Sequence, residues 1–343
     1  METGKVKAVL CAFLAAVFYA ASVPASKIML QQVGPITMAA LLYLGAGIGI
    51  AILSLFTEKG LTGTDRLTGK DLPYVIGMIV LDIAAPILLL LGISCGTSAN
   101  ASLLGNFEIV ATTVIALAIF KEAVSKRLWA AIALITLSSV LLSFEGADSL
   151  RFSFGSLFVL AATVCWGFEN NCTRNIASKN TYQIVVLKGV FSGLGSLAIA
   201  LAAGEALPGA LHAASALLLG FAAYGLSIFL YVRAQNVLGA AKTSAYYAVA
   251  PFVGAFLSFV FLQEPLSWTY AAALAVMIAG SVLVVIDTLV RNHEHAHPHT
   301  FTHTHDGSTH THTVMHSHDH LHYVSDDRHG HRHCREELEH LAQ

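Results

Sequence analysis

The chain has 343 residues, of which 55% are hydrophobic and 12% are charged, and its mean hydropathy is +0.67. Soluble domains carry roughly 25% charged residues, so this composition excludes an ordinary soluble protein and indicates an integral membrane protein. The net charge of -2 identifies no partner, because the charges lie in loops and in a C-terminal tail. We expect the lipid bilayer as a partner and no nucleic acid.

A helix that crosses a bilayer needs about 20 mostly apolar residues. Stretches of this kind occur ten times along the chain, which predicts an all-α integral membrane protein with ten transmembrane helices. The expected helices are 6–26, 35–56, 73–93, 99–120, 126–144, 154–174, 182–203, 212–234, 243–262 and 267–289.

The stretch 103–143 recurs as 245–285, which indicates an internal repeat. A shift of 142 positions pairs Glu122 with Glu264 and Ser125 with Ser267. Each copy is an apolar run, a short polar corner and a second apolar run, as in a helical hairpin. Because each half holds five helices, an odd number, the second half enters the membrane from the opposite side. We therefore expect two inverted five-helix repeats, over residues 1–145 and 153–290.

Basic residues at the helix ends predict the orientation. Thirteen Lys and Arg residues lie at one set of ends, among them Lys5, Lys121 and Arg291, whereas Lys27 and Arg151 are the two at the other set. The expected protein is a multi-pass protein of the plasma membrane with both termini in the cytoplasm.

The first helix of each half is interrupted by residues that disfavour a regular apolar helix. A shift of 147 sets Tyr19 against Trp166 and Pro24 against Asn171. Paired interruptions of this sort occur at binding sites between inverted repeats. The alternative is that Pro24 only kinks its helix and that the asparagines cap a helix that ends early. Asn170 and Asn171 are site candidates under the first interpretation.

Four charged residues fall inside apolar runs: Asp82, Glu108, Glu169 and Lys188. A charge at the bilayer centre costs at least about 2.5–3.5 kcal/mol, so it usually faces a cavity or a partner. Asp82 and Glu108 lie at similar depth on successive helices, where two carboxylates would repel and one would hold a proton. This arrangement favours proton coupling.

Charge pairing is the structural alternative for part of this set. Glu169 and Lys188 lie at similar depth and would neutralise each other. Glu108 has no basic residue nearby in the sequence, which favours a role in transport. Trp166, Tyr246 and Tyr247 are further candidates to line a cavity, although membrane aromatic residues more often mark the interface or fill space.

Three segments resemble the EamA-type repeats of the drug/metabolite transporter superfamily. They are FKEAVSKRLWAAIAL (Phe120–Leu134), APFVGAFLSFVFLQEPLSWTYAAALAVMIAGSVLVV (Ala250–Val285) and AATVCWGFENNCTRN (Ala161–Asn175). Pro251 matches the proline common in the fourth helix of such a repeat, and Glu122 and Glu264 match its corner acid. In the first repeat Ile109 stands at the proline position, beside Glu108. The resemblance implies ten helices in two inverted repeats, a central cavity and alternating access for small metabolites or amino acids, often outward.

Residues 291–343 differ from the rest of the chain, since they hold sixteen of the seventeen histidines and no apolar run. This composition predicts a disordered cytoplasmic tail. Its His-x-His pairs could bind Zn, Ni, Co or Cu, or the histidines could only make the tail soluble and pH-responsive. The candidate ligands are His293, His295, His297, His299, His303, His305, His310, His312, His316, His318, His320, His322, His329, His331 and His333.

Together these features predict a secondary transporter of a small metabolite or amino acid-like solute. We expect it to work by alternating access, to export its solute and to use protons as a coupling ion, with no required cofactor. The alternative is a transition-metal transporter that captures metal on the histidine tail. An enzyme is not expected, because no catalytic motif is present. The oligomeric state is left open, a homodimer included.

Overall fold

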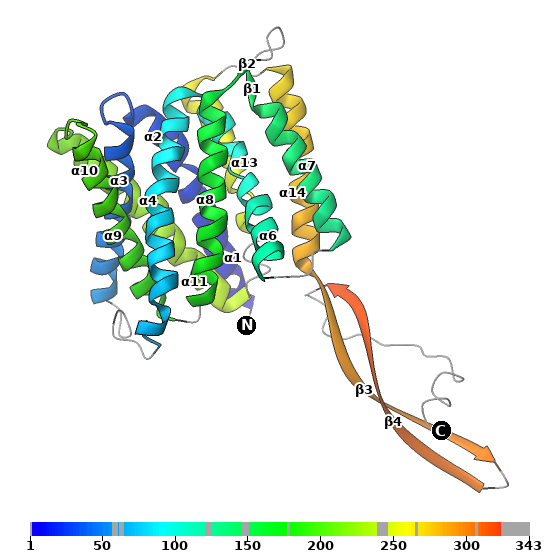
Figure 1. Ribbon diagram of the computed structural model, residues 1–343. Coiled ribbons are helices and arrows are strands. Elements are labelled where there is room, and N and C mark those ends of the chain that lie inside the picture. The colour runs from blue at the N-terminus through cyan, green and yellow to red at the C-terminus, as the bar shows by residue number, and fades with distance from the viewer. Residues whose placement is uncertain are drawn as a thin grey trace. The chain divides into compact units, whose positions relative to one another are not determined.

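The computed structural model describes residues 2–56, 61, 65–120, 125–145, 151–176, 179–238, 246–264, 267–305 and 308–323. The chain divides into two compact units, Met1–Val285 and Ile286–Gln343. The first unit is a bundle of helices (Figure 1), and each unit is described by itself below.

The helices of the first half follow the apolar runs. A single 3-10 turn, η1 (Gly69–Asp71), precedes the fourth of them, and its Thr68 and Asp71 side chains form a capping box. The helices are α1 (Glu2–Ala20), α2 (Ser22–Met29), α3 (Pro35–Leu55), α4 (Leu72–Cys95), α5 (Ser98–Leu104), α6 (Phe107–Phe120) and α7 (Lys126–Leu142).

The second half repeats this order. One π-helical segment, η2 (Phe221–Leu226), joins two of its helices into one continuous rod. The helices are α8 (Phe154–Ile176), α9 (Thr181–Ala202), α10 (Ala210–Gly220), α11 (Ser227–Leu238), α13 (Ala250–Leu262) and α14 (Trp268–Leu289).

Each of the ten predicted stretches coincides with one or more of these helices. Among the described residues, seven helices are long and apolar enough to cross a membrane, and Ala250–Leu262 is a shorter apolar helix. The protein is therefore a multi-pass membrane protein. The all-α prediction misses a short antiparallel pair between α7 and α8, β1 (Phe144–Glu145) and β2 (Arg151–Phe152).

The first helices of the two halves differ at the positions where polar residues or proline interrupt their apolar runs. In the first half, α1 ends at Ala20 and α2 begins at Ser22, so the break lies close to Pro24. In the second half, α8 runs unbroken through 169–171, as the predicted helix 154–174 does, so the alternative that the asparagines cap a helix that ends early is wrong. The Asn171 side chain donates to the Gly167 carbonyl 2.8 Å away, and so joins the helix instead of ending it.

Paired breaks do occur, in the fourth helix of each half. The turn 105–106 separates α5 from α6, and the turn 248–249 precedes α13. The shift of 142 that relates the two halves sets residue 106 against residue 248. The two halves therefore share a discontinuous fourth helix, which is a common feature of binding sites between inverted repeats.

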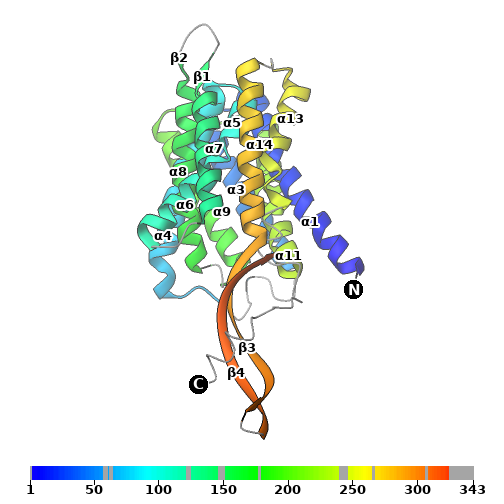
Figure 2. The same ribbon diagram turned by 90° about the vertical axis from the view of Figure 1, so that its right-hand side faces the viewer.

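Helices pack across the two halves in a reciprocal pattern. The second helices of the halves, α3 and α9, contact each other, as do the third and first, α4 with α8, and the first and third, α1 with α11. The fourth helix of each half also contacts the first helix of the other half, since α6 contacts α8 and α13 contacts α1. The fifth helices, α7 and α14, lie side by side (Figures 1 and 2), where the Ser138 hydroxyl donates to the Ala273 carbonyl at 2.6 Å.

Small residues permit these contacts. A Cβ added at Gly189 would lie 2.4 Å from the Gly47 nitrogen, and one at Gly193 would lie 2.8 Å from the Leu44 nitrogen. In lipid no hydrophobic effect draws helices together, so such close backbone approach supplies the packing energy. The glycines on α3 and α9 thus hold the two repeats in van der Waals contact.

The second unit contains two strands, β3 (Val290–His305) and β4 (Ser308–Tyr323), which pair as an antiparallel ladder. This differs from the predicted disorder of the tail. The alternation of histidine with threonine and other residues has a period of two, which suits a strand, and threonine is a favourable strand residue. Residues 324–343, with His329, His331 and His333, lie outside the described residues.

Candidate functional site

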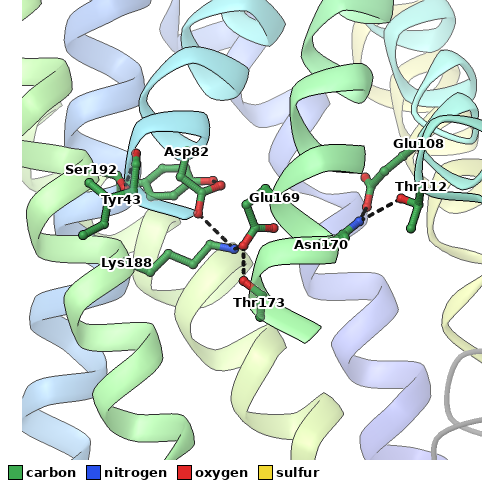
Figure 3. Close-up of polar contacts among 10 residues, drawn as sticks. Tyr43, Asp82, Glu108, Thr112, Glu169, Asn170, Thr173, Lys188 and Ser192 are labelled. Atoms are coloured by element: carbon green, nitrogen blue, oxygen red, sulfur yellow. Dashed lines mark hydrogen bonds and ion pairs between the residues drawn. The ribbon is translucent and has the colours of Figure 1, made fainter. Parts of the chain in front are cut away.

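Three of the four predicted membrane charges meet in one buried cluster, which we call the ion cluster: Asp82, Glu169 and Lys188. The Lys188 Nζ lies 3.0 Å from Asp82 Oδ2 and 2.9 Å from Glu169 Oε1 (Figure 3). Both acids are inaccessible, with exposed fractions of 0% and 2%, whereas the lysine side chain keeps 18%. Asp82 comes from the first repeat on α4, and the other two residues come from the second repeat on α8 and α9.

Neighbouring hydroxyl groups complete the ion cluster. The Tyr43 hydroxyl on α3 donates to Asp82 Oδ1 at 3.0 Å, and the Thr173 hydroxyl, one turn along α8, donates to Glu169 Oε1. Pro86 lies inside α4, so the carbonyl of Asp82, four residues earlier, loses its usual helical donor. The cluster therefore sits where α4 is locally weakened.

The fourth charge, Glu108, lies on the opposite side of α8 (Figure 3). The Asn170 amide Nδ2 donates to Glu108 Oε1 at 2.6 Å and lies 3.3 Å from the Thr112 hydroxyl oxygen. Glu169 and Asn170 are consecutive residues, and their side chains leave α8 toward different neighbours. One helix thus contacts the ion cluster with one residue and Glu108 with the next.

Glu108 also lines a cavity of about 150 Å³ between the two repeats. The first repeat contributes Tyr19 and Glu108, and the second contributes Trp166 and Tyr247. Both discontinuous helices reach it, since Gly105, Asn106, Ala248 and Ala250 are among its lining residues. Ligand sites in membrane carriers commonly lie at such an interface.

Comparison with known proteins agrees with this architecture. The model of the EamA-like transporter family matches residues 6–144 and 153–286, one match for each repeat. The chain belongs to the EamA-like transporter family. An uncharacterized transporter of Methanothermobacter thermautotrophicus is 27% identical over 290 residues, which cover 78% of this chain and 82% of that protein.

A solved crystal structure shares the fold of this EamA-like transporter. It superposes with a TM-score of 0.61 at 17% identity and covers 82% of this chain and 96% of its own. The match of the family model to both halves confirms the resemblance to EamA-type repeats. The protein is a membrane transporter and not an enzyme.

The structure groups the predicted site residues differently from the sequence. Glu169 does pair with Lys188, as the charge-pairing alternative predicts, but Asp82 joins that pair and is not placed against Glu108. Asp82 contacts Tyr43 and Lys188, whereas Glu108 contacts Asn170.

The aromatic candidates divide in a similar way. Trp166 and Tyr247 line the cavity, whereas Tyr246 does not and is 43% exposed. Asn171 is buried and donates to the Thr112 and Gly167 carbonyls, so it ties α8 to α6 and does not face the cavity lining.

Several charged residues near the helix ends have structural roles in this EamA-like transporter. Glu264 accepts from the Ser98 and Ala99 amides, each at 2.8 Å, at the N-terminus of α5. The Lys27 ammonium donates to the Ile93 and Gly96 carbonyls at the C-terminus of α4. Carboxylates at helix N-termini and amines at C-termini satisfy unpaired backbone groups. Glu122, the counterpart of Glu264, lies outside the described residues.

Four residues of the site are not among those predicted from the sequence: Tyr19, Tyr43, Thr112 and Thr173. Tyr19 carries a signal that could have identified it, because the shift of 147 sets it against Trp166, and both line the cavity. Thr173 also carries a signal, because it follows Glu169 by four residues on the same helix. Tyr43 and Thr112 are hydroxyl residues in apolar helices, and only their positions across helix interfaces mark them. No sequence pattern in one helix shows which neighbour it will face.

The ion cluster leads to a prediction about folding. Replacing Lys188 with Met leaves Asp82 and Glu169 buried without their cation, which should cost about 3–5 kcal/mol and lower the thermal unfolding midpoint of the purified protein in detergent. The triple variant Asp82→Asn, Glu169→Gln, Lys188→Met carries no charge there and should recover most of the loss. A Lys188→Met midpoint equal to that of the wild type would contradict the role of the pairing, as would a triple variant no more stable than the single one.

Proposed function

We propose that this transporter is a secondary carrier that exports a small metabolite by alternating access, with the cavity as its solute site. The observation that carries the proposal is the cavity itself, because both repeats and both discontinuous helices line it. A rocking motion of one repeat against the other would open such a site to each side in turn. Amino acid-like solutes fall within this class.

The repeats are proposed to be inverted, over residues 1–145 and 153–290, with ten membrane crossings and residues 291–343 as a tail. The reciprocal packing of first with third and first with fourth helices supports a two-fold relation. The basic residues at one set of helix ends support cytoplasmic termini in a plasma membrane. Each half would then present the same surface to the other from opposite sides of the bilayer.

The ion cluster is proposed to bind the coupling proton. With all three groups ionised, two carboxylates and one ammonium give it a net charge of -1, which is costly in a buried site. A proton on Asp82 or Glu169 makes the cluster neutral. The hydroxyls of Tyr43 and Thr173 donate to its carboxylates, the Cys172 thiol lies near Glu169, and Glu108 lies beyond α8.

Helix α8 would couple the proton to the solute. A change in the charge of Glu169 alters its attraction to Lys188 on α9 and to the first repeat through Asp82. Asn170, the next residue, would carry any rotation or shift of α8 to Glu108 in the cavity. The two binding events would therefore act on one rigid element, as reciprocal coupling requires.

Flux through reconstituted proteoliposomes tests this proposal. Vesicles loaded with a pool of small metabolites should lose specific solutes, which mass spectrometry detects. If one proton exchanges for one solute, a pH gradient of one unit should support a solute concentration ratio across the membrane of up to about tenfold. In Glu169→Gln the remaining Asp82–Lys188 pair is neutral without a bound proton, so flux with and without the gradient should become equal.

Asp71→Asn is the matched control, because Asp71 is a carboxylate in an exposed capping box of the same protein. Its flux should keep the response to the pH gradient. A pH-driven accumulation that persists in Glu169→Gln would contradict the coupling role of the cluster, and an absence of flux for every solute would contradict the transporter proposal.

The metal-transporter alternative gains no support from the helical unit. Among the residues whose side chains the structure describes, no three His, Cys, Asp or Glu groups could hold a metal ion. The cavity contains no histidine. We therefore propose transition-metal binding for the tail only, as an accessory to the carrier.

The register of the tail ladder supports that accessory role. Four cross-strand pairs join histidine to histidine: His293 with His320, His295 with His318, His297 with His316, and His303 with His310. Because residues two apart in a strand share a face, the twelve histidines of β3 and β4 occupy one face of the ladder. Neighbouring histidine pairs bring four histidine positions to one part of the ladder, and imidazole is a favourable ligand for Zn²⁺ or Cu²⁺.

Zinc titration of the full chain in detergent by calorimetry checks this arrangement. Replacing the paired set His293, His295, His318 and His320 with Ala should weaken zinc binding at least about tenfold, because a whole ligand set is lost. The control replaces four histidines whose cross-strand partners are not histidine: His299, His305, His312 and His322. Equal losses in both variants would show that the register does not build the site.

A further inference from the structure

The chemistry of the cavity narrows the solute class beyond a small metabolite. Glu108 is the one carboxylate among its sixteen lining residues, and Tyr19, Trp166 and Tyr247 provide aromatic rings. The lining contains no Lys, Arg or His. The remaining surface is mostly aliphatic and glycine, with the side chains of Ser102 and Asn106 as additional polar groups.

Glu108 keeps binding capacity for a ligand. Its Oε1 accepts from the Asn170 amide at 2.6 Å, and a carboxylate can accept several hydrogen bonds through its two oxygens. No ion pair joins Glu108 to a described Lys or Arg, so its negative charge has no fixed counter-ion among those residues. Lys188, the cation of the ion cluster, already contacts two carboxylates on the far side of α8.

The aromatic rings complement a cation. The ring centroids of Tyr19 and Tyr247 lie 5.9 Å apart, and Trp166 lines the same cavity from the second repeat. Aromatic faces attract ammonium groups and also provide apolar area for the body of a ligand. A carboxylate beside several rings is thus suited to a protonated amine on an apolar or aromatic skeleton.

The backbone at the helix breaks offers little to an anion. Helix N-termini in carriers often bind a substrate carboxylate through free amides. Here the Glu108 and Ile109 amides donate to Gly105 and Asn106 carbonyls at 3.1 Å, and the Phe252 and Val253 amides share the Val249 carbonyl. These amides are already used at both breaks, so a ligand carboxylate would find neither a cation nor these donors.

The size of the cavity sets a further limit. Its volume of about 150 Å³ is well below the roughly 300–1,000 Å³ of pockets for drug-sized ligands. We propose, on the basis of the proposed transport function, that the cavity selects small protonated amines with an apolar or aromatic body. It discriminates against zwitterionic amino acids and carboxylates, with Glu108 as the ligand for the ammonium group.

Three probes that share a benzene ring and differ in their charged groups test this inference: 2-phenylethylamine, phenylalanine and 3-phenylpropanoate. Their binding to the purified full chain in detergent is measured by calorimetry. The amine should bind at least tenfold more tightly than phenylalanine, and the carboxylate should not compete. Equal or tighter binding of either carboxylate-bearing probe would overturn the inference, and so would failure of the amine to bind.

Glu108→Gln removes the charge but keeps an oxygen that can accept from Asn170, so it should weaken amine binding at least tenfold without unfolding the site. Glu108→Asp keeps the charge and should retain part of the affinity. Asp71→Asn is the control and should bind as the wild type does. An unchanged amine affinity in Glu108→Gln would also overturn the inference.

Proteoliposome flux separates this inference from the proposed function. If the protein carries some other solute but shows no preference for amines, only the amine specificity fails. If no solute in the pool crosses the reconstituted membrane, the proposed transport function fails as well. Amine efflux that is lost in Glu108→Gln supports both.

Discussion

A lysine held between two buried carboxylates from different repeats constrains the rest of the bundle. Asp82 belongs to the first repeat, whereas Glu169 and Lys188 belong to the second, and both acids are inaccessible. Such a set cannot be exposed to lipid at acceptable cost, so α4, α8 and α9 must stay packed around it. The glycines that bring α3 and α9 into backbone contact, and the tyrosine that reaches Asp82 from α3, fit the same requirement.

The two repeats are alike in shape and different in chemistry. Their helices contact one another reciprocally, their fourth helices break at related positions, and Tyr19 and Trp166 occupy related places in the cavity lining. The charges do not follow this relation. Ala250 stands at the position related to Glu108, and Ser22 stands at the position related to Glu169. Symmetric packing fits two similar states facing opposite sides, while the asymmetric charges fit the proposed single solute site and single proton site.

Helix positions, the repeat and the family could be read from the sequence because each depends on runs of many residues. The Glu169–Lys188 pair could also be predicted from the sequence, since both residues fall at similar positions near the same ends of successive predicted helices. The contact of Asp82 with that pair could not be predicted, because it depends on which faces of α4, α8 and α9 meet. The asparagines at 170–171 do not end their helix, since α8 continues to Ile176 and the Asn171 side chain donates to a carbonyl of its own helix. The breaks at 105–106 and 248–249 carry weak local signals, a glycine-asparagine pair in one case and a following Pro251 in the other.

Accessibility of the cavity from both sides of the membrane tests alternating access most directly. In a background without native cysteines, Ser102→Cys places a thiol in the cavity lining, and Gly69→Cys places one on the exposed turn before α4. Right-side-out and inside-out vesicles are treated with a small membrane-impermeant thiol reagent. The account predicts labelling of Ser102→Cys from both sides, slowed by transported solute, and labelling of Gly69→Cys from one side only. Labelling of Ser102→Cys from a single side, or from neither, would contradict it.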